Sequence, residues 1–97
     1  PEVKDFAVKI AETYRDNSKK VDEIISNYAK GWDFERLVKM DKDILRIAIS
    51  ELIYIKETPM KVAVDEAVEL AKKYSTDDSA TFVNGILAKV IVDNGLE

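Results

Sequence analysis

The sequence predicts an all-α protein, with one long N-terminal helix followed by a compact bundle of about three to four helices. Apolar residues recur at alternating spacings of four and three, the period of a helix with one buried face. Two prolines and three glycines in 97 residues leave room for long helices. No segment shows the apolar–polar alternation that is typical of a β-strand.

The first pattern predicts one helix over residues 2–29. Asn17 and Ser18 interrupt its apolar stripe, and a continuous helix is favoured over the alternative, a break at this point. Lys30 and Gly31 are expected to end the helix, because glycine adopts the left-handed conformation common at helix ends. The stripe positions are Val3, Ala7, Ile10, Tyr14, Asn17, Val21, Ile24 and Tyr28.

The middle of the chain predicts a short turn at residues 32–37 and a second helix. Asp41 is expected to be the N-cap of that helix, because the apolar pattern begins just after it. The helix should end at about Lys56, since proline at position 59 disfavours a helical conformation in Thr58. Its apolar positions are Ile44, Leu45, Ala48, Leu52 and Ile55.

The last third predicts two helices, at about residues 61–74 and 80–92, joined by a polar loop. Ser79 is expected to cap the last helix, and Asn94-Gly95 to end it. Gly85 lies inside that helix, where glycine costs about 1 kcal/mol relative to alanine, so we expect it to permit close approach of a neighbouring helix. The expected inward positions are Val64, Ala67, Val68, Ala71, Phe82, Val83, Ile86, Leu87 and Val90.

The composition excludes several classes of function for this chain. An apolar fraction of 46% and a charged fraction of 35% are typical of one folded domain rather than of a disordered protein. Without cysteine or histidine there is no disulfide framework, usual zinc site or histidine-based catalytic triad. No apolar run approaches the roughly 20 residues that span a bilayer, so a cytoplasmic location is the simplest expectation. The net charge of −4 argues against a stand-alone nucleic-acid binder.

Acidic pairs are frequent, but none has the surroundings of a catalytic site. Glu66 and Glu69 would share a helix face and could serve metal binding or acid–base chemistry. No histidine supports them and lysines lie one turn away, so solvated salt bridges are the favoured interpretation. We therefore expect no enzyme activity, no cofactor and no metal.

Residues 74–79 and the start of the last helix form a candidate RNA contact. A helix N-terminus exposes backbone donors that favour phosphate oxygens, and the rings of Tyr74 and Phe82 could stack on unpaired bases for about 1–3 kcal/mol each. Asp77 and Asp78 repel phosphate, although a carboxylate accepts hydrogen bonds from base amino groups. For Phe82, packing in the core is an equally good interpretation.

One basic cluster stands near the start of the second helix. Separate surface salt bridges are one interpretation, with Arg46 bonding a neighbouring carboxylate such as Glu51 or Glu66. The cluster consists of Arg36, Lys39, Lys42 and Arg46.

The last third also carries an unusual combination of segments: KVAVDEAVELAKKY at residues 61–74, STDDS at 75–79 and FVNGIL at 82–87. Upstream stand Trp32, Arg36-Leu37, Asp41, Ile44-Leu45-Arg46 and Glu51-Leu52-Ile53-Tyr54. Together these segments resemble the NusB family of bacterial transcription antitermination factors. The resemblance implies a NusB-like helical bundle that binds boxA-type RNA together with NusE, a small-subunit ribosomal protein, and modifies elongating RNA polymerase.

The resemblance also implies site residues. For RNA contact it adds Asp78, Ser79 and Phe82 to the aromatic candidate Tyr74. Near the start of the second helix it implies a NusE docking face, where charge pairing would suit a basic partner. The residues expected on that face are Glu35, Asp41, Lys42 and Arg46.

Members of the family open with an arginine-rich segment, whereas this chain begins inside what resembles the third helix of the family, so we expect a fragment. Residues 1–30 would be a long helix left over from an N-terminal subdomain, and residues 31–97 a C-terminal subdomain. The stripe formed by Val3, Phe6, Ile10 and Tyr14 should then be incompletely covered, and a homodimer is one way to bury it.

Two alternatives to the antitermination function remain. NusB-like folds also form the RNA-binding domain of some ribosomal RNA cytosine methyltransferases. The acidic composition also fits an interaction domain without RNA binding.

Overall fold

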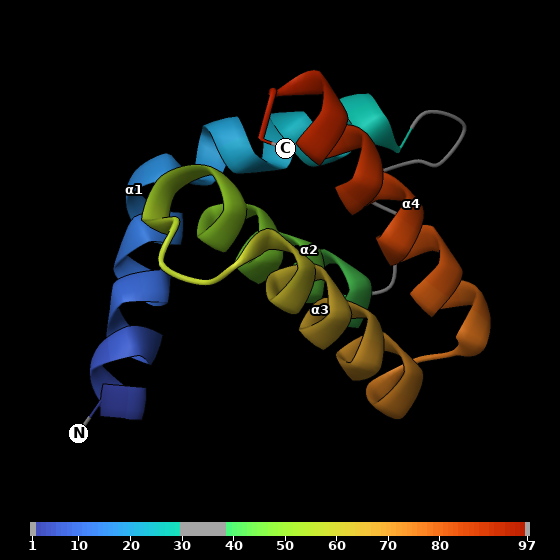
Figure 1. Ribbon diagram of the computed structural model, residues 1–97, viewed down its shortest axis with the longest axis horizontal. Helices are drawn as coiled ribbons and strands as arrows, with labels where there is room; N and C mark the ends of the chain where they lie inside the picture. Colours follow the sequence, from blue (N-terminus) through green and yellow to red (C-terminus); the bar gives the residue numbers. More distant parts are fainter. Residues whose placement is uncertain (1, 30–38, 97) are drawn as a thin grey trace.

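The computed structural model describes residues 2–29 and 39–96, and most of these residues lie in helices (Figure 1). The elements are α1 (Glu2–Tyr28), α2 (Lys39–Ile49), the π-helix η2 (Ser50–Ile55), α3 (Met60–Tyr74) and α4 (Asp77–Asp93). The predicted all-α class is confirmed. The predictions for Lys30-Gly31, for the turn at residues 32–37 and for Glu35 lie outside the described residues.

Helix α1 contains a kink at Asn17, so the favoured prediction of a continuous helix was wrong at this residue. Asn17 has φ −123 and ψ 16, and its side-chain amide donates a hydrogen bond to the Thr13 carbonyl at 2.9 Å. In an unbroken helix that carbonyl would accept from the Asn17 backbone N–H, so the side chain competes with the backbone. Before the kink, the first half of α1 lies at one edge of the molecule and leads to the N-terminus (Figure 1).

The core is built from residues of the second half of α1 and of α2, η2, α3 and α4. Helix α3 buries only alanines, one per turn, which lets α2 and α4 approach it closely. Val64, Val68 and Phe82, which we expected to face inward, are partly buried and pack against this core. The buried apolar residues are Val21, Ile24, Ile25, Ala29, Ile44, Leu45, Ala48, Ile49, Leu52, Ala63, Ala67, Ala71, Ala80, Val83, Ile86, Leu87 and Val90.

The second helix begins before Asp41 and ends as a π-helix. Asp41 lies in the first turn of α2 and is not its N-cap, because its carboxylate is engaged by α4 instead. At the other end, the Lys56 N–H donates to the Glu51 carbonyl at 2.8 Å, a bond from residue i to i−5. Lys56 has φ 57, which ends the helix where the sequence predicted.

Two glycines have different environments. Gly95 has φ +61, as expected for the residue that follows a helix end. A Cβ placed on Gly85 would meet no heavy atom within 4 Å among the described residues. The prediction that Gly85 permits close helix approach was therefore wrong, because it faces open space on α4.

Candidate functional site

A cluster of hydrogen bonds joins the start of α4 to the first turn of α2. The Ser79 hydroxyl donates to Asp41 Oδ2 at 2.9 Å, and it accepts from the hydroxyls of Ser75 at 2.9 Å and Thr76 at 3.1 Å. Asp41 and Ser79 are 38 positions apart in sequence. The sequence assigned them to two different surfaces, and the structure brings them together.

Thr76, not Ser79, is the N-cap of α4. Its hydroxyl accepts from the Ser79 backbone N–H at 2.9 Å. Ser79 therefore lies one turn inside the helix, and the prediction that it caps α4 was wrong by three residues. This arrangement frees the Ser79 side chain to reach across to α2.

The other predicted RNA residues are unequally exposed. Tyr74, the last residue of α3, is 57% exposed, and the Lys73 ammonium lies 5.3 Å from its ring centre. Asp78 is exposed in the first turn of α4, where the helix dipole favours a carboxylate. Phe82 is half-buried against the core. Tyr74 is thus the aromatic face that is most accessible to a ligand in this group.

Among the predicted docking residues, Arg46 is engaged in an ion-pair network between α1 and α2. Its guanidinium bonds both oxygens of Asp22, at 3.0 and 3.2 Å, and lies 3.3 Å from Asp43 Oδ1. The salt-bridge interpretation is correct in kind, but the carboxylate on the neighbouring helix is Asp22 rather than Glu51 or Glu66. The Asp22 hydrogen bond is the main reason why the pKa of Arg46 is raised.

The remaining docking residues differ in accessibility. Lys42 is half-buried next to Asp41, and Asp41 itself is 5% exposed. Lys39, another member of the basic cluster, pairs with Asp43 at 2.8 Å on the surface. A protein partner that approaches the start of α2 would therefore meet lysine side chains before it met the Asp41 carboxylate.

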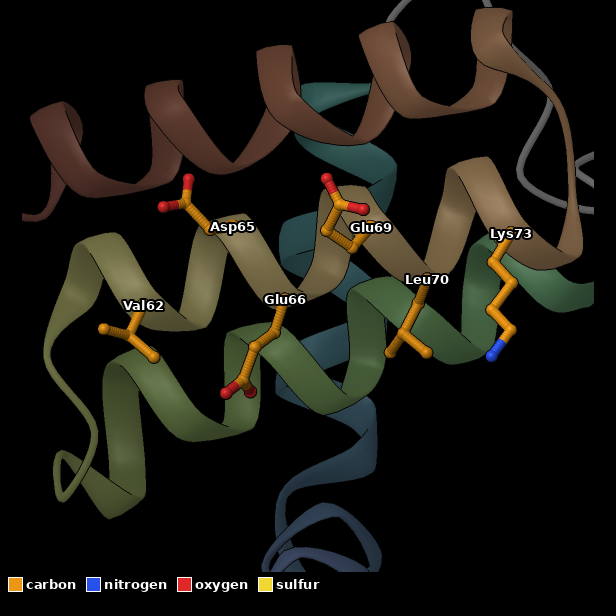
Figure 2. A pocket seen from close by; sticks show the side chains of 6 residues that line it. All are labelled: Val62, Asp65, Glu66, Glu69, Leu70 and Lys73. Carbon is orange, nitrogen blue, oxygen red and sulfur yellow. The ribbon is translucent and has the colours of Figure 1, made fainter.

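An acidic groove of about 540 Å³ runs along the exposed face of α3 (Figure 2). Val62 and Leu70, which are 43% and 38% exposed, lie two turns apart with Glu66 between them. Figure 2 shows these three side chains on the side of α3 that faces α2, while Asp65 and Glu69 point to the other side. The sequence analysis interpreted the carboxylates as solvated and did not predict the exposed apolar pair. The pattern that indicates the pair is the order apolar, acidic, apolar at spacings of four residues.

A second groove, of about 420 Å³, lies between the first half of α1 and α2. Phe6, Ile10 and Tyr14 are half-buried, which confirms for these three residues that the stripe is incompletely covered. The groove is lined by Ala7, Ile10, Ala11, Tyr14, Asp43, Arg46 and Ile47.

Two features are absent from residues 2–29 and 39–96: a cluster of metal-ligating side chains and a helix that could span a membrane. No three acidic residues in these ranges cluster as a metal site would require. No described helix is long and apolar enough to cross a membrane.

Comparison with known families identifies the fold. The sequence model of the NusB family matches residues 1–92. This chain belongs to the NusB family. The predicted family resemblance is therefore confirmed, and it covers almost the whole chain.

Curated relatives in the NusB family carry the name transcription antitermination protein NusB. The protein of Frankia casuarinae is 46% identical over 96 residues, which are 99% of this chain and 71% of that protein. The protein of Streptomyces avermitilis is 44% identical over 90 residues, which are 93% of this chain and 62% of that protein. The chain thus spans about two thirds of the length of these relatives.

Solved structures share the arrangement of helices. T. maritima NusB matches with a TM-score of 0.87 and 38% identity, over 93% of this chain and 63% of that chain. A chain in a crystal structure of a plectonemic RNA supercoil matches with a TM-score of 0.91 and 29% identity, over 97% of this chain and 68% of that chain.

Proposed function

We propose that this NusB-family chain is the part of a transcription antitermination factor that binds boxA-type RNA together with NusE and acts on elongating RNA polymerase. The names of the relatives support this function. The observation that carries it is the short loop at the start of α4, where exposed Tyr74 and Asp78 lie beside a helix N-terminus. It is proposed as a binding factor of the cytoplasm, where bacterial transcription takes place, and not as an enzyme.

The proposed RNA surface consists of Tyr74, Asp78 and Phe82, grouped around Ser79, whose hydroxyl is bonded to Asp41. Tyr74 offers a face for stacking on an unpaired base, and Asp78 can accept hydrogen bonds from base amino groups. The first-turn N–H groups of α4 favour a phosphate oxygen. With a net charge of −4, the chain is expected to bind RNA weakly alone and more tightly beside a basic partner.

The proposed NusE surface consists of the docking residues Lys42 and Arg46, extended by the acidic groove on α3. The third predicted docking residue, Asp41, lies buried beneath this surface. Because α2 with η2 and α3 run in opposite directions, the Lys73 end of the groove lies near the start of α2 (Figures 1 and 2). Apolar contacts with Val62 and Leu70 and charge pairing with Glu66 suit a basic protein with exposed apolar side chains.

The groove between α1 and α2 supports a homodimer through the first half of α1, since an uncovered apolar face of this kind usually finds a partner. Analytical ultracentrifugation with and without the substitution Ile10→Asp tests this part of the proposal. A monomer at all concentrations would contradict it.

The function is tested by fluorescence anisotropy of a labelled boxA RNA, titrated with this chain in the presence and absence of NusE, beside a full-length relative. We expect the relative to bind, and this chain to bind only with NusE present. If neither protein binds under either condition, the antitermination assignment fails.

A further inference from the structure

The Ser79 hydroxyl has no hydrogen-bonding capacity left for a ligand. A hydroxyl offers one donor and two acceptor lone pairs. In this structure Ser79 donates to Asp41 and accepts from Ser75 and Thr76. An RNA that bonded this hydroxyl would have to replace an internal hydrogen bond.

Asp41 is equally unsuited to direct contact with a partner. It is 5% exposed, and its Oδ1 atom is buried without a hydrogen-bond partner among the described residues. Burying a carboxylate costs free energy unless the group is hydrogen-bonded, and a hydrogen bond to a charged acceptor such as Oδ2 is stronger than one to a neutral acceptor. The bond from Ser79 therefore holds the start of α4 strongly against α2.

We propose that Asp41 is a positioning residue for the RNA surface: it fixes residues 75–79 through Ser79, in the arrangement that presents Tyr74 and Asp78. This inference rests on the proposed RNA-binding function, and it reassigns Asp41 from the NusE docking face. The loop is short and lies between the end of α3 and the start of α4. A shift of Ser79 should therefore move the exposed residues Tyr74 and Asp78 as well.

The test separates the two surfaces. For Asp41→Ala and Ser79→Ala we expect RNA affinity, measured with saturating NusE, to fall about 10-fold, since each loses a hydrogen bond to a charged acceptor. Affinity for NusE without RNA should stay within about twofold in both variants, because neither changes an accessible docking group. If Asp41→Ala instead weakens NusE binding and leaves RNA binding unchanged, Asp41 is a docking residue and the inference is wrong.

Two further variants and one control variant distinguish positioning from a general loss of stability. Asp41→Asn keeps an acceptor of the same size for Ser79 and should restore RNA affinity to within about twofold of the unmodified chain. The double variant Asp41→Ala/Ser79→Ala should bind RNA no more weakly than either single variant, because both substitutions remove the same hydrogen bond. Thr81→Ala, two residues further along α4, removes an exposed hydroxyl that donates to the Asp77 carbonyl of its own helix, and it serves as the matched control.

Amide hydrogen exchange in the absence of RNA and NusE tests whether Asp41 anchors the loop. Amide hydrogen exchange at Ser79 and Ala80 should accelerate in Ser79→Ala and Asp41→Ala, while exchange at Val83 and Ile86 stays slow. Unchanged exchange at positions 79 and 80 would overturn the inference. If the unmodified chain binds no RNA even with NusE, the proposed function fails, and exchange alone still shows whether Asp41 anchors the loop. If Asp41→Ala does not fold, Ser79→Ala alone tests the inference, because it removes the same hydrogen bond.

Discussion

Arg46 holds Asp22 through two parallel hydrogen bonds, from Nε to Oδ1 at 3.0 Å and from Nη2 to Oδ2 at 3.2 Å. The Tyr14 hydroxyl also donates to the Asp22 carboxylate, and the guanidinium lies 5.3 Å from the Tyr14 ring centre. These contacts join both halves of α1 to α2 across the kink at Asn17. Arg46 thus stabilises the fold, whatever it contributes to a docking face.

Replacing Arg46 by lysine should lower the free energy of unfolding by about 1–2 kcal/mol, because an ammonium cannot make two parallel hydrogen bonds to one carboxylate. The side chains of Arg46 and Asp22 are only 25% and 30% exposed, so water screens the pair weakly. Urea denaturation measures the change. Arg15→Lys is the control, since Arg15 is 72% exposed and pairs with the adjacent Asp16. Equal effects of the two substitutions would show that the paired geometry is unimportant.

Helix positions were predictable because apolar spacing depends on local sequence alone. The details of the site were not, because they depend on contacts distant in sequence. Thr76 and Ser79 are both good N-cap residues, and only the position of Asp41 in space decides that Ser79 turns towards α2. At Asn17 the sequence flagged a polar interruption, but it did not determine whether the amide would bond water or the Thr13 carbonyl.

Gly85→Ala should raise the free energy of unfolding by about 1 kcal/mol, because alanine is the better helix former and its methyl group meets open space. Gly95→Ala is the opposing control. At φ +61 a Cβ is strained, so this substitution should destabilise by about 1 kcal/mol. Thermal unfolding followed by circular dichroism compares the two variants. A loss of stability in Gly85→Ala would mean that position 85 has a packing role after all.

Glu51→Gln should stabilise the protein at pH 7. Burial, and secondly the negative charge of Glu66, raise the pKa of Glu51 above its ordinary value of 4.5, while Thr58 acts in the opposite direction. Its Oε2 atom is buried without a hydrogen-bond partner in the described part of the chain. At pH 7, above the ordinary pKa, ionisation of Glu51 is therefore less favourable in the folded than in the unfolded chain, and the neutral amide removes that cost.

The sign of the pH dependence follows from the raised pKa of Glu51. Below 4.5 the side chain is protonated in both the folded and the unfolded chain, so the advantage of glutamine should vanish there. The advantage should grow as the pH rises from 4.5 through the folded-state pKa, and then stay constant. Urea denaturation of both proteins between pH 4 and 8 measures this difference. An advantage that is the same at every pH would contradict an ionised Glu51 as its cause.

Tyr74→Ala should weaken RNA binding in the presence of NusE by about 10-fold, the cost of removing one ring that stacks on a base. The ring is exposed at the end of α3, so its loss should leave the free energy of unfolding nearly unchanged. Tyr74→Phe keeps the stacking face and should bind as the unmodified chain does. If phenylalanine fails as badly as alanine, the hydroxyl and not the ring makes the contact.

Glu66→Lys should weaken NusE binding by about 10-fold, because it places a cation between Val62 and Leu70 on the floor of the acidic groove, opposite a basic partner. Glu12→Lys makes the same change of charge on the exposed surface of α1 and controls for net charge. Surface plasmon resonance at two salt concentrations should show an effect of Glu66→Lys that shrinks as salt increases. RNA affinity measured with saturating NusE should be unchanged, because the groove is proposed to contact the protein partner and Tyr74 to contact RNA. Equal losses for Glu66→Lys and Glu12→Lys would mean that net charge, rather than this groove, governs docking.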